Sequence, residues 1–190
     1  MKKTWIEIKG KLSELSPEIS ESFSNPATQD EISHLETAIG QKLPDSFVSY
    51  LLTFNGQNHN NNSVTFVGAN CLLTITEIIN LWTLQNDLFG DEPNIEITEN
   101  KIKPKIWDKG WIPFADFMGQ QRLVIDLNPG INGTYGQILQ LWAGQDLEDD
   151  EVVVAGSFEE FSEKILEYLQ KEKMTISDEN IIEFDDFWLI

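Results

Sequence analysis

The side chains that could perform nucleophilic, acid–base or metal chemistry in this chain are few and scattered. There is one cysteine, Cys71, and there are two histidines, His34 and His59. A nucleophilic cysteine needs a base beside it, but Cys71 falls in a predicted buried strand and the histidines in a helix and an asparagine-rich loop. The GxSxG, HExxH and P-loop motifs are missing from the sequence. We therefore expect no catalytic residue, no metal site and no cofactor.

An acidic cluster at residues 146–151 is the best candidate for a cation site or a charged contact surface. It lacks the alternating ligands and the central glycine of an EF-hand loop, which disfavours Ca²⁺. Two interpretations then stay open, a solvated loop and a patch that contacts a protein partner. In the second case the contact residues are Glu148, Asp149, Asp150 and Glu151.

The charge of the chain is strongly negative and unevenly distributed. It has 32 acidic and 13 basic residues, for a formal net charge of −19. Residues 146–190 hold fifteen of the acids and three lysines, so most of the charge lies near the carboxyl end. Such an asymmetry can steer a basic partner toward the chain.

Composition excludes several classes of protein. With a single arginine, Arg122, the chain is unsuited to bare nucleic acid or to an anionic membrane surface. One cysteine cannot form an internal disulfide. Charges within residues 5–9 interrupt the apolar stretch of a signal peptide, and the sequence has no apolar run long enough for a transmembrane helix. We expect a cytoplasmic protein.

The pattern of elements predicts an α+β fold, with an antiparallel sheet and helices packed against it. Predicted helices cover residues 3–15, 28–39, 43–54, 76–89 and 157–171, and predicted strands cover 64–67, 71–75, 111–115, 122–127, 136–142 and 152–155. Two helices begin with a capping box, Thr28 with Glu31 and Ser157 with Glu160. Residues 91–109 are charged and irregular, which suggests a long surface connection.

The clearest part of the predicted sheet is the hairpin that begins at Trp111. Pro113 indicates an edge position or a bulge in its first strand. A four-residue turn at 117–120 would place Asp126 opposite Trp111. Asp126 then has two interpretations, a polar contact to a partner or an acceptor for the amides of the following Asn-Pro-Gly loop.

Several segments together resemble a known family. Residues 38–56 read AIGQKLP through LLTFNG, residues 111–116 WIPFAD, residues 124–129 VIDLNP, residues 133–138 GTYGQI and residues 157–161 SFEEF. This order is similar to the SUKH superfamily, in its branch similar to the yeast cell-wall assembly regulator, over about residues 26–170. The resemblance implies a binding protein without catalytic residues. Bacterial members look like immunity proteins that neutralise polymorphic toxins, commonly nucleases, whereas others are eukaryotic regulators.

The carboxyl-terminal tail combines acids with large apolar residues. Its apolar side chains, Phe184 and Phe187–Leu189 among them, either dock on the domain or form an exposed anchor rimmed by Asp185 and Asp186. In the second case Trp188 contacts the partner. A glycan site built from the six tryptophans is disfavoured, because most of them have the spacing of core residues.

We therefore expect one SUKH-like domain over 1–190, with a core at about 26–170, an extra helix in 1–25 and an acidic aromatic tail at 174–190. The main hypothesis is a non-catalytic immunity protein that binds a basic toxin. The alternatives are a regulatory scaffold or adaptor for cellular proteins, and an enzyme or small-ligand binder with an unrecognised pocket. The sequence leaves the oligomeric state open.

Overall fold

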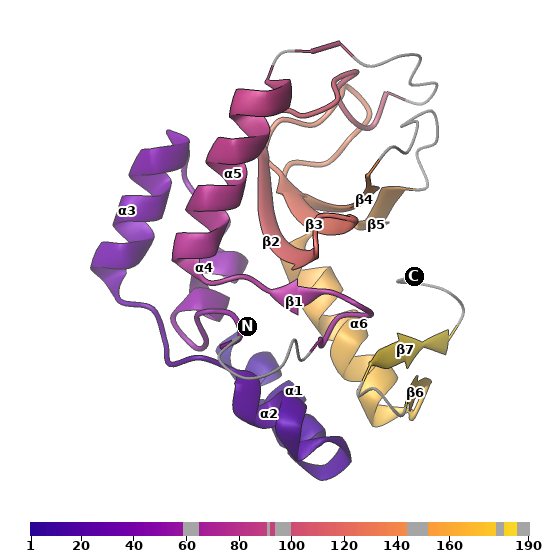
Figure 1. Ribbon diagram of the computed structural model, residues 1–190. Coiled ribbons are helices and arrows are strands. Elements are labelled where there is room, and N and C mark those ends of the chain that lie inside the picture. The colour runs from indigo at the N-terminus through magenta and orange to yellow at the C-terminus, as the bar shows by residue number, and fades with distance from the viewer. Residues whose placement is uncertain (59–64, 91, 94–99, 144–151, 178–180, 186–190) are drawn as a thin grey trace.

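A five-stranded antiparallel sheet lies at the centre of the computed structural model, which describes residues 1–58, 65–90, 92–93, 100–143, 152–177 and 181–185 (Figure 1). Its strands follow the chain order, namely β1 (Cys71–Leu72), β2 (Trp111–Phe117), β3 (Gln121–Asp126), β4 (Gln137–Trp142) and β5 (Val153–Ala155). The predicted α+β class and the three consecutive antiparallel strands within 111–142 are confirmed. Asp126 pairs with Trp111 as predicted, but the turn is 118–120 rather than 117–120, because Phe117 already pairs with Gln121, and a register shift after Pro113 restores the expected pairing.

At Pro113 the paired strand is β3, through Val124, because β1 pairs with β2 only at Ala115 and Asp116. The register of β2 against β3 shifts between Pro113 and Ala115. The bulge alternative is therefore confirmed, at a position beyond the residues of β2 that pair with β1. A bulge accommodates the missing N–H of proline without breaking the rest of the ladder.

The helices that the structure describes are α1 (Lys2–Leu15), α2 (Pro17–Ser22), α3 (Gln29–Ile39), α4 (Asp45–Leu51), α5 (Ile75–Phe89) and α6 (Phe158–Gln170). The sequence did not predict α2. Pro17 ends α1 and also occupies the first turn of α2, where proline needs no N–H partner. The Ser16 hydroxyl caps α2 by accepting a hydrogen bond from the Ile19 N–H at 3.5 Å. None of the described helices has the length and apolar character needed to cross a bilayer.

Side-chain caps begin most of the longer helices. The predicted capping box of α3 is present, since the Thr28 N–H donates to Glu31 at 2.7 Å and the Glu31 N–H donates to the Thr28 hydroxyl at 3.2 Å. A second box, Thr74 with Glu77, opens α5. In α6 half of the predicted box is wrong, because the Glu160 carboxylate accepts from the Gly156 N–H, one residue before the Ser157 cap.

The main core fills the space between one face of the sheet and the helices. Its centre is an aromatic cluster in which Trp5 of α1 meets Tyr50 of α4 and Phe158 of α6, with ring centroids 4.4 and 6.0 Å from the Trp5 ring. Phe158, Phe161 and Ile165 point into this core, as predicted for the late helix. Figure 1 shows α3 and α5 side by side on one flank, where α5 also packs against β2.

A second, smaller core covers the other face of the sheet. Ile102 and Trp107 of the connection after α5 are buried there against Trp111, Val124 and Leu139. The expectation of a surface connection at 91–109 is therefore wrong for residues 102 and 107. The lysines around them are exposed or half-buried, whereas Asp108 is buried, so the charged composition of the segment masked its buried positions.

The strand prediction differs from the structure in three places. The predicted strand 71–75 is shorter, because β1 ends at Leu72 and Thr74 caps α5, which begins at Ile75. Within the described part of the predicted 64–67 strand, Val67 forms an isolated bridge with Asn70, because Gly68 turns the chain with a φ of 57°. In the tail, β6 (Met174–Ile176) and β7 (Ile182–Phe184) form a hairpin, and Phe184 packs on Tyr168 at 5.8 Å. Docking of the tail is thus confirmed for Phe184, whereas Phe187–Leu189 lie outside the described residues.

Candidate functional site

The most elaborate polar arrangement of the described chain lies where β3 ends. Asp126 is fully buried, and its carboxylate accepts hydrogen bonds from the Asn128 N–H and the Gln137 side-chain amide, both at 2.9 Å. Burial raises the pKa of Asp126 from an ordinary value of 3.8 to about 6, although these two hydrogen bonds oppose the shift. The carboxylate is therefore held inside the protein by donors of the fold.

Asp108, a second buried carboxylate, joins the same network from the connection after α5. It accepts hydrogen bonds from the Gly110 N–H at 2.7 Å and from the Asn128 side-chain amide at 3.0 Å. Lys105 forms an ion pair with it at 3.3 Å. The network of Asp108, Asp126, Asn128 and Gln137 therefore ties the connection at 100–110 to the start of the β3–β4 loop.

The β3–β4 loop, residues 127–136, projects beyond the strand ends beside the connection at 100–110, at the top of Figure 1. Its backbone bonds to that connection, through Gly130 N–H to Lys101 O and Asn132 N–H to Asn100 O, both at 3.0 Å. Two apolar side chains remain exposed on the loop, Ile131 at 90% and Tyr135 at 56% of their surface. An apolar tip on an anchored loop is a candidate protein contact.

Comparison with known proteins shows the family to which this fold belongs. A sequence model of the SMI1/KNR4 family (SUKH-1) matches residues 26–164. The chain belongs to this family. The matched segment of this SUKH-1 chain contains the sheet, the buried network and the β3–β4 loop, whereas α1, α2 and the β6–β7 hairpin lie outside it.

Two fungal relatives are similar to this SUKH-1 chain. It is 26% identical over 200 residues to KNR4/SMI1 homolog 2 of Debaryomyces hansenii, a match that covers 83% of this chain and 33% of that protein. It is 24% identical over 222 residues to the cell wall assembly regulator SMI1 of Saccharomyces cerevisiae, with 97% of this chain and 42% of that protein covered. The chain thus spans less than half the length of these relatives.

The family segments named from the sequence come together in the SUKH-1 fold. The Tyr135 hydroxyl donates to the Lys42 carbonyl at 3.2 Å, and Pro44 lies beside Gly136. The Phe158 ring of the late segment packs edge-to-face against Phe47 and Phe114 of two earlier segments. These segments are therefore neighbours in space as well as an ordered pattern in the sequence.

Most of the contact residues expected from the sequence cannot be placed. Glu148, Asp149, Asp150, Glu151, Asp186 and Trp188 lie outside the described residues. Asp185 is described, and it is exposed directly after β7, where its N–H donates to the Lys173 carbonyl at 3.0 Å. These residues therefore stay predictions.

The residues that could have done chemistry are separate from one another in the described SUKH-1 chain. Burial, with the nearby Asp116 and Glu77 carboxylates, raises the pKa of Cys71 to about 11, so its thiol is a poor nucleophile. His34 is exposed on α3, and His59 lies outside the described residues. Arg122 pairs with Asp116 at 3.1 Å. Among the described residues no group of three or more His, Cys, Asp and Glu side chains could hold a metal ion.

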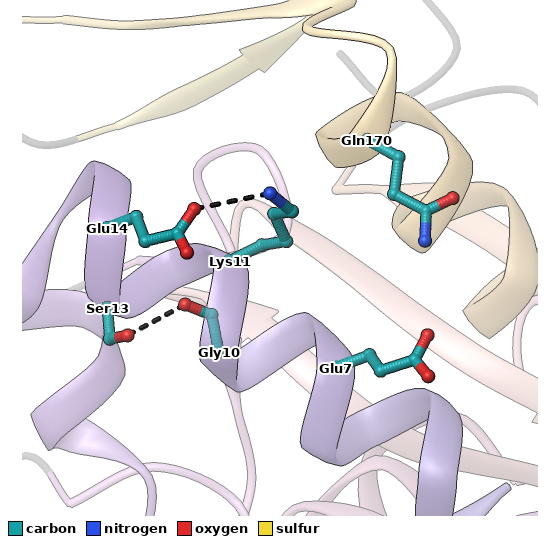
Figure 2. A pocket seen from close by; sticks show the side chains of 6 residues that line it. All are labelled: Glu7, Gly10, Lys11, Ser13, Glu14 and Gln170. Atoms are coloured by element: carbon teal, nitrogen blue, oxygen red, sulfur yellow. Dashed lines mark hydrogen bonds and ion pairs between the residues drawn. The ribbon is translucent and has the colours of Figure 1, made fainter.

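A shallow pocket of about 460 Å³ lies between α1 and the end of α6 (Figure 2). Lys11 and Glu14 form an ion pair across its α1 side at 3.2 Å, and the Ser13 hydroxyl donates to the Gly10 carbonyl. Gln170 faces them from α6. The charged groups on the α1 side satisfy one another in open water, so the pocket gives no indication of a bound ligand.

The sequence analysis did not single out Ile131, Asp108 or Gln137. Ile131 carried a usable signal, because it is an isolated aliphatic residue in a turn of Asn, Pro, Gly and Thr. Asp108 and Gln137 carried none, since their roles depend on Asn128 and Asp126, which the fold brings to them from other segments.

Proposed function

We propose that this chain is a non-catalytic protein-binding domain that neutralises a cognate basic toxin, as an immunity protein does. The observation that carries the proposal is the net charge of −19 on a member of the SMI1/KNR4 family. A polymorphic toxin that attacks nucleic acid must hold phosphates with lysine and arginine. An acidic domain competes for that surface, and its field speeds the encounter. The compartment that we propose is the cytoplasm.

The state of the Cys71 and Asp126 side chains supports a role without catalysis. The Cys71 thiol has a raised pKa, and the buried Asp126 carboxylate is occupied by hydrogen-bond donors of the fold. The SUKH-1 resemblance implies no set of catalytic residues that could be carried over. Binding to another protein is the remaining activity that the charge and the exposed loop serve.

The test uses the product of the gene adjacent to the one that encodes this chain. We expect the purified chain to bind a toxin domain encoded there, to abolish its activity in vitro and to protect cells that express it. Heparin at matched charge is the control for generic polyanion binding, and it should bind more weakly. A toxin domain that is neither bound nor inhibited would contradict the proposal.

A second candidate is a regulatory scaffold or adaptor for cellular proteins. It is favoured by the relative from Saccharomyces cerevisiae, which is named as a cell wall assembly regulator. An isolated gene, together with stable complexes between the chain and proteins of its own cell, would favour this candidate. Protection against an adjacent toxin would favour the immunity role.

A further inference from the structure

Ile131 is unusual for its exposure. It leaves 90% of its surface in water, the highest value among the large apolar residues of the described part of the chain. Its neighbours are of the kinds that usually form turns, with Pro129 and Gly130 before it and Asn132 and Gly133 after it. A polar residue at position 131 would be compatible with the turn at least as well, so turn formation does not explain the isoleucine.

The backbone around Ile131 is fixed on both sides. The N–H groups of Gly130 and Asn132 donate to the connection at 100–110, and the Gly133 N–H donates to the Gly130 carbonyl at 3.1 Å. A Cβ atom at Gly130 would lie 2.0 Å from the Asn100 carbonyl oxygen, and one at Gly133 would lie 2.1 Å from that of Lys101. The two glycines thus let two segments meet at backbone contact distance, directly beside the tip.

The base of the loop is also anchored. The Thr134 N–H donates to the Gln137 side-chain oxygen at 3.0 Å, and the same Gln137 amide holds the Asp126 carboxylate and the Lys101 carbonyl. The Tyr135 hydroxyl is held by the Lys42 carbonyl, which leaves its half-exposed ring in a set position. An anchored loop loses little conformational entropy when a partner binds it.

We propose that the β3–β4 loop, with Ile131 as its anchor residue, is the surface through which this domain contacts a basic protein that offers an apolar pocket for one aliphatic side chain. This proposal rests on the proposed binding function and names the contact surface for it. Anchors of this kind dominate the affinity of many interfaces when a rim excludes water around them. Tyr135 would belong to that rim.

The choice of partner follows from charge. The loop itself carries no charged side chain, and its charged neighbours Lys42 and Lys101 meet it through their backbone carbonyls, so insertion of Ile131 into a pocket buries no ion of the loop. The chain as a whole carries −19, which attracts a basic protein and repels a second copy or an anionic lipid surface. Long-range attraction and short-range apolar contact therefore act together on a basic protein.

The test places a photoreactive residue, p-benzoylphenylalanine, at position 131 of the full chain in its native cells. Position 88 is the matched control, because Leu88 is also an exposed apolar residue, at 55%, but lies on α5. Position 185 reports on the acidic end. We expect position 131 to cross-link a basic protein, which mass spectrometry then identifies, and position 88 not to do so.

The cross-linked protein is then purified and its binding measured by calorimetry. Ile131→Ser should weaken binding by about tenfold or more, whereas Ile131→Val should stay within about threefold and Leu88→Ser should have no effect. Thermal unfolding should be the same for wild type and Ile131→Ser, because the side chain contributes little buried area.

The outcomes separate this proposal from the function beneath it. A basic partner that cross-links from position 185 but not from position 131, and that binds Ile131→Ser as tightly as wild type, overturns the loop proposal and leaves the binding function intact. Cross-links to a second copy of the chain also overturn it. If no position captures a protein, both proposals fail together. Amide hydrogen exchange at Gly130 and Asn132 as fast as in a free peptide would show that the loop is not anchored, and would also overturn the loop proposal.

Discussion

Asp126 shows how a single buried carboxylate organises the surface above it. A buried charge is costly unless donors surround it, and here the donors come from Asn128 and Gln137 at the two ends of the β3–β4 loop. The loop conformation that satisfies the carboxylate is also the one that presents Ile131. Ile131 is thus exposed, whereas Asp126 and Gln137, which hold the loop, are buried.

The pH dependence of stability should reveal this carboxylate. Because the folded-state pKa of Asp126 is raised from 3.8 to about 6, its ionisation in the folded state costs free energy. Its stabilising contribution is complete below pH 3.8 and is lost as the pH rises through about 6, a change of about 3 kcal/mol in all. Roughly half of this change falls between pH 5 and pH 7.5.

Urea denaturation of wild type and Asp126→Asn at these two pH values measures the effect. Asparagine at position 126 cannot ionise. The substitution should therefore lower the free energy of unfolding, relative to wild type, by more at pH 5 than at pH 7.5. Asp87→Asn, which removes an exposed carboxylate from α5, is the control and should show no such difference. Equal destabilisation by Asp126→Asn at both pH values would mean that Asp126 does not titrate in this window.

At the scale of elements, local chemistry made some features predictable and tertiary contacts decided the others. The Thr28–Glu31 box depends on residues close in sequence and is confirmed. The Trp111–Asp126 pairing is also confirmed, but a turn one residue shorter than predicted and a bulge after Pro113 together produce it. Burial of Trp107 depends on Val124 and Leu139, and anchoring of the loop depends on Asn100 and Lys101. Those contacts join distant segments, so composition alone suggested a surface connection.

The first helix, α1, lies outside the segment that matches the family, yet it is built into the main core. Trp5 is fully buried, and its indole N–H donates to the Ser162 hydroxyl of α6 at 3.1 Å. We expect Trp5→Ala to lower the free energy of unfolding by about 3–5 kcal/mol, because it removes a large buried side chain and leaves a cavity. Chemical denaturation measures this loss.

The adjacent residue provides the control for this prediction. Ile6 is 51% exposed on the same helix, so Ile6→Ala should change the free energy of unfolding by no more than about 0.5 kcal/mol. If Trp5→Ala costs as little as Ile6→Ala, α1 is a loosely attached extension. The expected difference would instead make α1 part of the folding unit of this SUKH-1 chain.

At the scale of the whole molecule, we expect charge to affect association and apolar contact to affect dissociation. In the binding that we propose, the acidic residues of 146–190 would act over distance and set the rate of encounter. The uncharged β3–β4 loop would act at contact and set the lifetime of the complex. A partner would therefore meet a negative field first and an apolar anchor second, which makes the two contributions separable by kinetics.

Charge reversal at the acidic cluster tests the first of these steps. Glu148→Lys, Asp149→Lys and Asp150→Lys together should lower the association rate with the basic partner by roughly tenfold at low salt and change the dissociation rate much less. A triple control, Glu14→Lys, Glu21→Lys and Asp30→Lys, makes the same change in net charge at exposed positions of the amino-terminal part. Stopped-flow or surface plasmon resonance gives both rates.

If only net charge matters, the acidic-cluster variant and the amino-terminal control variant will slow association equally. A directional field requires the acidic-cluster variant to slow it more. Physiological salt should reduce the difference, since exposed charges are screened beyond roughly 8 Å. An association rate indifferent to salt and to both triples would make the acidic end a solubility feature, and binding would then rest on the apolar loop.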